Sequence, residues 1–411
     1  MPRLSYRRVV ARARAALGSD APGLRQGLAA LLVSSVGDLV AGLTLGAITH
    51  TLEALPGLLV LIPAAIGMRG NIFGALGSRL GTAIHTGTFR LSRRPDTVVG
   101  QNVLASIALT FSISFALAVL AKTIAVAFGV DTISIVDFAV ISVMGGVISS
   151  VVVLAITLGV ATVCVRRDWD MDNVAAPLVT AAGDMVTLPS LFVATYLVGV
   201  RVVTPVLGVM TAILAIVSVV AALKTGHQLL RRIVRESLPV LVVAGAVDVV
   251  AGLTIEQRLE SFLAFPALLV LIPPFLEDTG ALGGILVSRL SSKLHLGVID
   301  PVAAPQRPAR DDFALIAFFA VPVFVLVALS AEVASIVFDR ASPGALRMVE
   351  VSVLGGFLAT GVAMLVAYYG SIAAFRLGLD PDNHGVPLLT STMDLVGAIS
   401  LILAVYVVGI G

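Results

Sequence analysis

Long runs of apolar residues, separated by short polar segments, follow one another from Leu28 to Ile410. Each run contains at least about 20 residues, which is enough for one α-helix to cross a hydrocarbon core of about 30 Å. Glycines recur inside these runs, as is typical of membrane helices that pack closely against one another. The pattern predicts an all-α polytopic membrane protein.

The composition supports this class. Hydrophobic residues make up 58% of the 411 residues and charged residues 13%, with a mean hydropathy of +1.05. A typical soluble domain carries about 25% charged residues. The single cysteine, Cys164, excludes an intramolecular disulfide. The net charge of +2 says little about partners. We expect divalent metal ions and the lipid bilayer as partners, and no nucleic acid.

The second half of the chain repeats the first at a constant offset of 210 residues. Asp38-Leu-Val-Ala-Gly-Leu-Thr44 corresponds to Asp248-Val-Val-Ala-Gly-Leu-Thr254 (248 − 38 = 210), and the segment 58–63 recurs unchanged at 268–273. The same offset relates Ser78-Arg79-Leu80 to Ser288-Arg289-Leu290, His85 to His295, Gly145-Gly146 to Gly355-Gly356, Pro177 to Pro387 and Asp184 to Asp394. Polar residues that stay in register without a gap indicate a tandem duplication.

Each unit contains five predicted helical spans. They cover 27–49, 55–84, 98–128, 134–164 and 174–199 in the first unit, and 238–258, 265–294, 312–338, 345–374 and 384–410 in the second. One further apolar run, 202–223, has no counterpart. Because five is an odd number, this extra helix gives both units the same orientation. We therefore predict about eleven spans in two parallel repeats, related by a pseudo-twofold axis along the membrane normal.

The charges in the loops predict the topology and the domain limits. Lys and Arg are concentrated in alternate loops, such as 90–94, 166–167 and 224–235, which favours an N-terminus inside and a C-terminus outside the cytoplasmic membrane. The expected parts are a basic cytoplasmic arm (1–26), a first repeat (27–200), a linker helix with a cytoplasmic loop (201–236) and a second repeat (237–411). The arm lacks the pattern of a cleavable signal and suits a short helix on the membrane surface.

The first and last spans of each unit carry polar residues near the middle of the membrane: Asp38, Thr180 and Asp184 in the first unit, and Asp248, Thr390 and Asp394 in the second. An ionisable residue inside a span costs several kcal/mol and needs a partner, water or an ion. A carboxyl group that is protonated, or bonded to a neighbouring hydroxyl, is the structural alternative. Duplicated carboxylates, with no buried Lys or Arg expected to neutralise them, favour a cation site.

The second span of each unit contains residues that should interrupt a regular apolar helix: Pro63, Gly67 and Gly70-Asn71 in the first, and Pro273-Pro274, Glu277-Asp278 and Gly280 in the second. Proline leaves an upstream carbonyl without its donor. Carbonyl, amide and carboxylate oxygens are hard ligands that suit Mg²⁺ or Ca²⁺. A proline kink that only shapes packing is the alternative. We add Asn71, Glu277 and Asp278 to the candidate metal site.

These motifs resemble those of the MgtE magnesium transporters and their tandem-duplicated solute-carrier relatives. Pro63 with Gly70-Asn71 and Ser78-Arg79-Leu80 resembles the second-helix signature of that family, and Asp172-Asn173, Pro177 and Asp184 resemble its last-helix signature. The resemblance implies five-helix units around a central pore, where Asp184 and Asp394 help to bind hydrated Mg²⁺ and Asn71 lines the pathway. Ala281 replaces the Asn in the second unit, which predicts a lopsided site.

The resemblance also bears on gating. Bacterial MgtE proteins carry soluble sensor domains, and no such domain is recognised in this sequence. We therefore expect any gating by cytoplasmic Mg²⁺ to use the membrane part. The acidic loops at Asp168, Asp170, Asp380 and Asp382 are the candidates.

Together these features predict a transporter of divalent cations, with Mg²⁺ as the main cargo and other divalent ions as alternatives. An exchanger coupled to Na⁺ or H⁺ is the second hypothesis. An intramembrane aspartyl hydrolase is a remote one, because Asp184 follows Gly183 but Asp394 follows Met393, and the Tyr-Asp partner motif is absent. We expect no enzymatic activity. The duplication makes a monomer sufficient, and a homodimer is also compatible with the sequence.

Overall fold

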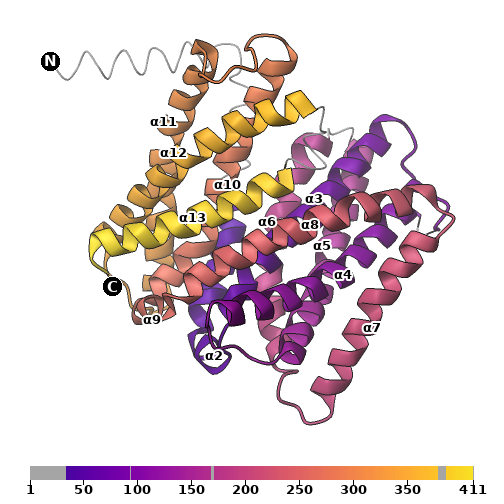
Figure 1. The fold of residues 1–411 in the computed structure, drawn as a ribbon, viewed down its shortest axis with the longest axis horizontal. Helices are drawn as coiled ribbons and strands as arrows, with labels where there is room; N and C mark the ends of the chain where they lie inside the picture. Colours follow the sequence, from indigo (N-terminus) through magenta and orange to yellow (C-terminus); the bar gives the residue numbers. More distant parts are fainter. Residues whose placement is uncertain (1–33, 93, 168–170, 378–385, 411) are drawn as a thin grey trace.

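The computed structural model describes residues 34–92, 94–167, 171–377 and 386–410. Every regular element in these ranges is an α-helix, which confirms the predicted fold class (Figure 1). Ten of the described helices are long and apolar enough to cross a membrane. The first predicted span, 27–49, lies partly outside the described residues, where only 34–47 is seen as helix. The count of eleven spans therefore stays a prediction.

The helices follow the predicted duplication. After the helix at 34–47, the first unit contains α2 (Thr49–Ala54), α3 (Leu58–His85), α4 (Val98–Ala127), α5 (Ile135–Arg167) and α6 (Met171–Thr195). The unpaired helix is α7 (Val203–Lys224), and the second unit contains α8 (Gln228–Glu256), α9 (Leu259–Ala264), α10 (Pro266–His295), α11 (Arg307–Val337), α12 (Ala345–Leu377) and α13 (Val386–Val408). The short helices α2 and α9, which the sequence analysis missed, are also 210 residues apart.

Helices α3 and α10 form the centre of the bundle. In the most apolar 18-residue stretch of each helix, 67% of the residues of α3 and 72% of those of α10 are buried, more than in the other spans. In α7 the share is only 22%. Figure 1 accordingly shows α7 at one edge of the molecule, far from α11 and α12. The helix without a repeat partner is thus a peripheral linker, and the duplicated second spans build the core.

The first helix of each unit packs against the second helix of the other unit. An added Cβ at Gly42 would lie 2.1 Å from the carbonyl oxygen of Val270, and one at Gly252 would lie 2.4 Å from that of Val60. Only glycine permits such an approach between backbones, as in other membrane helix pairs. Because both crossings are related by the offset of 210, the two units interlock symmetrically.

The predicted interruption of the second spans is wrong. Both α3 and α10 continue as helices through Pro63 and through Pro273-Pro274. Each proline removes one backbone donor, but a membrane helix tolerates this loss where neighbouring helices cover the freed carbonyl. The carbonyl of Val270, four residues before Pro274, is the group that Gly42 approaches. Tight packing of the neighbouring helix therefore keeps α10 intact.

The loops at one end of the bundle are tied together by hydrogen bonds. The amide of Gly57 donates to Glu256 Oε1 (3.0 Å), and the amide of Ala267 donates to the carbonyl of Ala341 (3.2 Å). We call this the α2–α9 end, and Figure 1 shows the C-terminus beside it. The opposite end, where α3 and α10 finish, is the His85–His295 end. The loop charges predict that the α2–α9 end faces outward.

Candidate functional site

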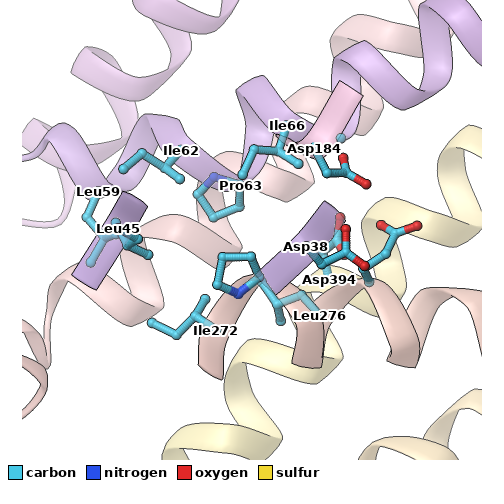
Figure 2. A pocket seen from close by; sticks show the side chains of 13 residues that line it. Asp38, Leu45, Leu59, Ile62, Pro63, Ile66, Asp184, Ile272, Leu276 and Asp394 are labelled. Carbon is cyan, nitrogen blue, oxygen red and sulfur yellow. The ribbon is translucent and has the colours of Figure 1, made fainter. Parts of the chain in front are cut away.

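A small cavity of about 40 Å³ lies between the two central helices (Figure 2). Ten of its thirteen lining residues form five pairs at the offset of 210: Ile62 and Ile272, Pro63 and Pro273, Ile66 and Leu276, Gly67 and Glu277, and Asp184 and Asp394. Asp38, Leu45 and Leu59 complete the lining. A cavity lined by symmetry-related positions must lie on the pseudo-twofold axis. This is where parallel repeats place a shared pathway.

Each unit contributes a pair of neighbouring carboxyl groups at or beside this cavity, since Asp248 does not belong to the lining. Asp38 lies against Asp184, and Asp248 lies against Asp394, so each pair joins the first and last helices of one unit. Figure 2 shows Asp38, Asp184 and Asp394 pointing toward one region. Glu277 from α10 interacts electrostatically with Asp184 and with Asp394. Five predicted site residues are therefore brought together.

Helix α3 reaches the same region without a side chain. An added Cβ at Gly67 would lie 3.2 Å from Oδ2 of Asp248 and 3.6 Å from Oδ2 of Asp394. Glu277 is the counterpart of Gly67 in the second unit. The site is therefore lopsided, with an open backbone on one side of the axis and a carboxylate on the other.

Several oxygens of these carboxylates have no hydrogen-bond partner among the described residues. They are both oxygens of Asp38, both of Asp248 and Oδ2 of Asp184, and these three side chains are at most 2% exposed. A buried carboxylate that receives no hydrogen bond is costly unless a cation or a proton compensates it. The orphaned oxygens therefore need a compensating partner, which is either a cation or a proton shared between the two carboxyl groups of each pair.

Asp278 is close to the site but does not line the cavity. The hydroxyl of Ser35 donates to its two carboxylate oxygens at 3.2 and 3.3 Å. Asp278 is fully buried and lies near enough to Asp38 for their charges to interact. It contributes negative potential at the cavity, while its own oxygens are already partnered.

Three predicted residues lie away from the carboxylates. Asn71 lines a separate cavity of about 20 Å³, together with Arg79, Ser237 and Pro387 among others. The methyl group of Thr180 lies 3.9 Å from the position of an added Cβ at Gly70. The hydroxyl of Thr390 donates to the carbonyl of Pro387 in its own helix (3.1 Å). All three lie on the His85–His295 side of the carboxylates, one or more helical turns away.

The carboxylates do not form a compact ligand set. In the described part of the chain, no three Asp, Glu, His or Cys side chains are arranged to hold one metal ion. Mg²⁺ gives up its water reluctantly and is usually bound through a few carboxylates and several waters. The described carboxylates therefore do not by themselves form a complete set of metal ligands.

One buried arginine was not predicted from the sequence. Arg69 in α3 is only 1% exposed, which overturns the expectation of no buried basic residue. Its guanidinium donates to the hydroxyls of Ser114 and Ser150 (both 2.7 Å), not to a carboxylate. Thr110 accepts a third, longer hydrogen bond (3.4 Å). The sequence could not show that these three hydroxyls, on α4 and α5, share one partner. The signal was a charge directly before Gly70-Asn71.

The last-helix signature and the acidic loops are largely outside the described residues. Segments 168–170 and 378–385 belong to this part, as do the side chains of Asp172, Asn173 and Pro177. The predicted gating role of Asp168, Asp170, Asp380 and Asp382 therefore stays a prediction.

A multi-pass helical membrane protein with unpartnered carboxylates on its central axis has the features of a cation transporter. Residues 62–194 and 272–404 match the sequence profile of the MgtE family, described as divalent cation transporter. The chain belongs to this family. The two matched segments begin 210 residues apart (272 − 62), in agreement with the duplication.

The chain is also similar to curated solute carriers along most of its length. Solute carrier family 41 member 3 of Rattus norvegicus is 25% identical over 401 residues, covering 89% of this chain and 83% of the relative. Solute carrier family 41 member 2 of Homo sapiens is 24% identical over 404 residues, covering 92% and 69% respectively. No solved structure matches the chain.

Proposed function

We propose that this protein moves divalent cations, chiefly Mg²⁺, across the cytoplasmic membrane through the cavity on its pseudo-twofold axis. The observation that carries the proposal is the group of carboxylates that both units place near the axis. Among them, Asp38, Asp184 and Asp248 are buried and have oxygens without a hydrogen-bond partner in the part of the chain that the structure describes. Family membership supports the class of cargo.

The residues fall into two groups in this proposal. Asp184 and Asp394, with Asp38, Asp248 and Glu277, hold the largely hydrated ion at the axis. Asn71, Thr180 and Thr390 line its route toward the His85–His295 end, and Asp278 adds negative potential. The two repeats act as halves of one pathway, so a single chain is sufficient.

The membrane potential supplies the driving force. An inside-negative potential of 100 mV is worth about 2.3 kcal/mol for each charge, hence about 4.6 kcal/mol for a divalent ion. Inward movement of Mg²⁺ then needs no second energy source. This argument favours uniport over exchange.

Proteoliposomes that contain the purified protein provide the test. We expect saturable Mg²⁺ uptake driven by an inside-negative potential, with Ca²⁺ and Mn²⁺ as competitors that define selectivity. The double variant Asp184→Asn with Asp394→Asn should reduce uptake at least about 100-fold, since it neutralises one carboxylate in each pair. The matched control, Asp131→Asn with Asp311→Asn, changes two exposed carboxylates and should transport normally.

Two results would change the proposal. Uptake that requires a Na⁺ or proton gradient would replace uniport by coupled exchange. Normal uptake by the Asp184→Asn, Asp394→Asn double variant would show that the axial carboxylates do not bind the transported ion.

A further inference from the structure

We infer that the axial carboxylates are closed off from the α2–α9 end by an apolar gate, in which Ile62 and Ile272 form the facing pair. The inference rests on the proposed function, because a gate matters only if an ion passes along the axis. It follows from where water can reach the two central helices.

Accessible residues of α3 and α10 lie almost entirely on one side of the carboxylates. On the α2–α9 side of the carboxylates, every residue of 58–65 in α3 and of 267–276 in α10 is buried. On the other side, accessible positions recur at 67, 71, 74, 75 and 78 in α3 and at 277, 281, 284, 285 and 288 in α10. These spacings place each set on one helix face. The two faces are related by the offset of 210, which indicates one vestibule shared by both units.

Two glycines on these faces have open space beside them, which supports a vestibule. An added Cβ at Gly74 or at Gly284 would have no neighbouring atom within 4 Å. These glycines lie two turns from Gly67 and Glu277, toward the His85–His295 end. The carboxylates are therefore reached from that end.

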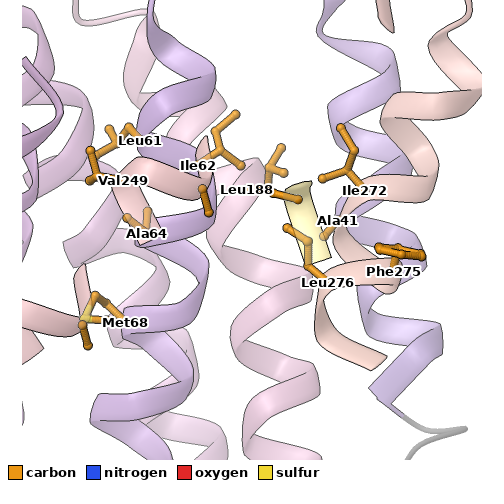
Figure 3. Packing of buried hydrophobic residues seen from close by; sticks show 14 of the residues in the cluster. Ala41, Leu61, Ile62, Ala64, Met68, Leu188, Val249, Ile272, Phe275 and Leu276 are labelled. Atoms are coloured by element: carbon orange, nitrogen blue, oxygen red, sulfur yellow. The ribbon is translucent and has the colours of Figure 1, made fainter. Parts of the chain in front are cut away.

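The opposite wall of the cavity is wholly apolar. Beyond the carboxylates, toward the α2–α9 end, it is lined by Leu45, Leu59, Ile62, Pro63, Ile66, Ile272, Pro273 and Leu276. Ile62 and Ile272 are 3% and 2% exposed, and Figure 3 shows them among packed hydrophobic side chains of the central helices. A narrow apolar segment excludes water and thereby blocks a hydrated ion. The packing along the axis thus forms a barrier as well as a core.

The gate keeps the symmetry that the ion site lacks. Ile62 and Ile272 occupy equivalent positions and are the same residue. About one and a half turns further along the same helices, the equivalent positions differ, with Gly67 in α3 and Glu277 in α10. A barrier on the axis needs matching apolar surfaces from both helices, whereas an ion site tolerates ligands from one side.

The test compares two double variants that differ only in polarity. Thr and Val have nearly the same shape, so Ile62→Thr with Ile272→Thr and Ile62→Val with Ile272→Val remove similar volumes. A cysteine at Gly70, in a Cys164→Ala background, reports access to the layer just beyond the carboxylates. It is labelled with a membrane-impermeant thiol reagent from each side of oriented vesicles, and Mg²⁺ uptake is measured in parallel.

We expect the Gly70→Cys reporter with the native Ile pair to react at least about tenfold faster from the His85–His295 side. The Thr pair should accelerate labelling from the α2–α9 side, and increase Mg²⁺ uptake, by at least about tenfold over the Val pair. Equal labelling of the Thr and Val pairs from that side would overturn the gate. The labelling measures access and does not depend on which ion is transported. If the protein is labelled from one side only but transports no Mg²⁺, the proposed function is overturned and the gate is not.

Discussion

Each unit has a notch beside a glycine of its fourth span, Gly146 in α5 and Gly356 in α12, and the two units fill this notch with different side chains. In the first unit an added Cβ at Gly146 would lie 2.5 Å from Ser114 Oγ and 2.8 Å from Nη2 of Arg69, so a guanidinium and its hydroxyl partners occupy the space. In the second unit Gly356 faces Phe324, which occupies the position equivalent to Ser114. The ring of Phe324 packs on Phe275 with centroids 5.1 Å apart. One notch holds a buried cation, and its copy holds an aromatic pair.

The difference extends to the charge of the central helices. Within the segment around the cavity, α3 contributes Gly67, Met68 and Arg69, whereas α10 contributes Glu277, Asp278 and Thr279. The first and last helices of both units nevertheless keep their Asp residues. A side-chain hydrogen bond is also kept, since the hydroxyl of Ser142 donates to the carbonyl of Ser114 and the hydroxyl of Ser352 to that of Phe324. Duplication thus preserves the frame of the bundle while the charges of its two halves diverge.

The largest effect is expected at the notch of the first unit. Ser114→Ala with Ser150→Ala leaves the buried guanidinium of Arg69 without its two short hydrogen bonds. Uncompensated buried charges cost about 3–5 kcal/mol of unfolding free energy. Denaturant unfolding in detergent micelles measures the loss.

Adding Arg69→Met to that pair should restore most of the stability, because it removes the unpaired charge and keeps similar volume. The second unit supplies a control. Thr360→Ala, at the position equivalent to Ser150, removes a hydroxyl that bonds its own helix through Gly356, and we expect it to cost less than about 1 kcal/mol. A triple variant no more stable than the double would contradict the assignment of the penalty to Arg69.

The crossings between units should respond equally in both halves. Gly42→Ala and Gly252→Ala each force a methyl group into a neighbouring backbone, and overpacking of this kind costs about 1–3 kcal/mol. Gly74→Ala and Gly284→Ala, which meet no atom within 4 Å, are the matched controls and should be neutral or slightly stabilising. Thermal unfolding of the four variants makes the comparison. A loss confined to one crossing would show that the interlock is asymmetric.

The smallest effect is expected at the divergent acids of α10. Glu277→Gln should reduce Mg²⁺ uptake about tenfold, or about 1.4 kcal/mol, because this carboxylate faces the cavity. Asp278→Asn should have a weaker effect, since Asp278 lies outside the lining and already accepts from Ser35. Initial rates of uptake in proteoliposomes distinguish the two variants. A reversed order would place the ion nearer to Ser35 than to the axis.

The fold was largely predictable because the duplication constrains it twice. Long apolar runs indicated the spans, and polar residues at a fixed offset indicated which spans are equivalent. The packing of the first helix of each unit against the second helix of the other unit could not be predicted. It depends on the close approach of Gly42 and Gly252 to backbones that are distant in sequence. The continuity of α10 through Pro273-Pro274 was missed for the same reason, because the compensating neighbour comes from the other unit.

The site was predictable in part. Asp38, Asp184, Asp248, Asp394 and Glu277 were recognisable as ionisable residues in apolar spans, and the structure brings them together. The side-by-side pairing within each unit was not foreseen, since alignment gives equivalence but no distances. Arg69 was missed because its partners are serines and a threonine, which carry little signal in a membrane helix. The apolar gate was hidden because its isoleucines look like ordinary core.

The central claim is that the transported ion binds on the axis between the two units. Anomalous diffraction from crystals grown with Mn²⁺, which substitutes for Mg²⁺ and scatters anomalously, tests it most directly. We expect an anomalous peak among Asp184, Asp394 and Glu277, at distances that leave room for bound water, and its loss in the Asp184→Asn, Asp394→Asn variant. Peaks found only at surface carboxylates, with none at the axial cavity, would contradict the account.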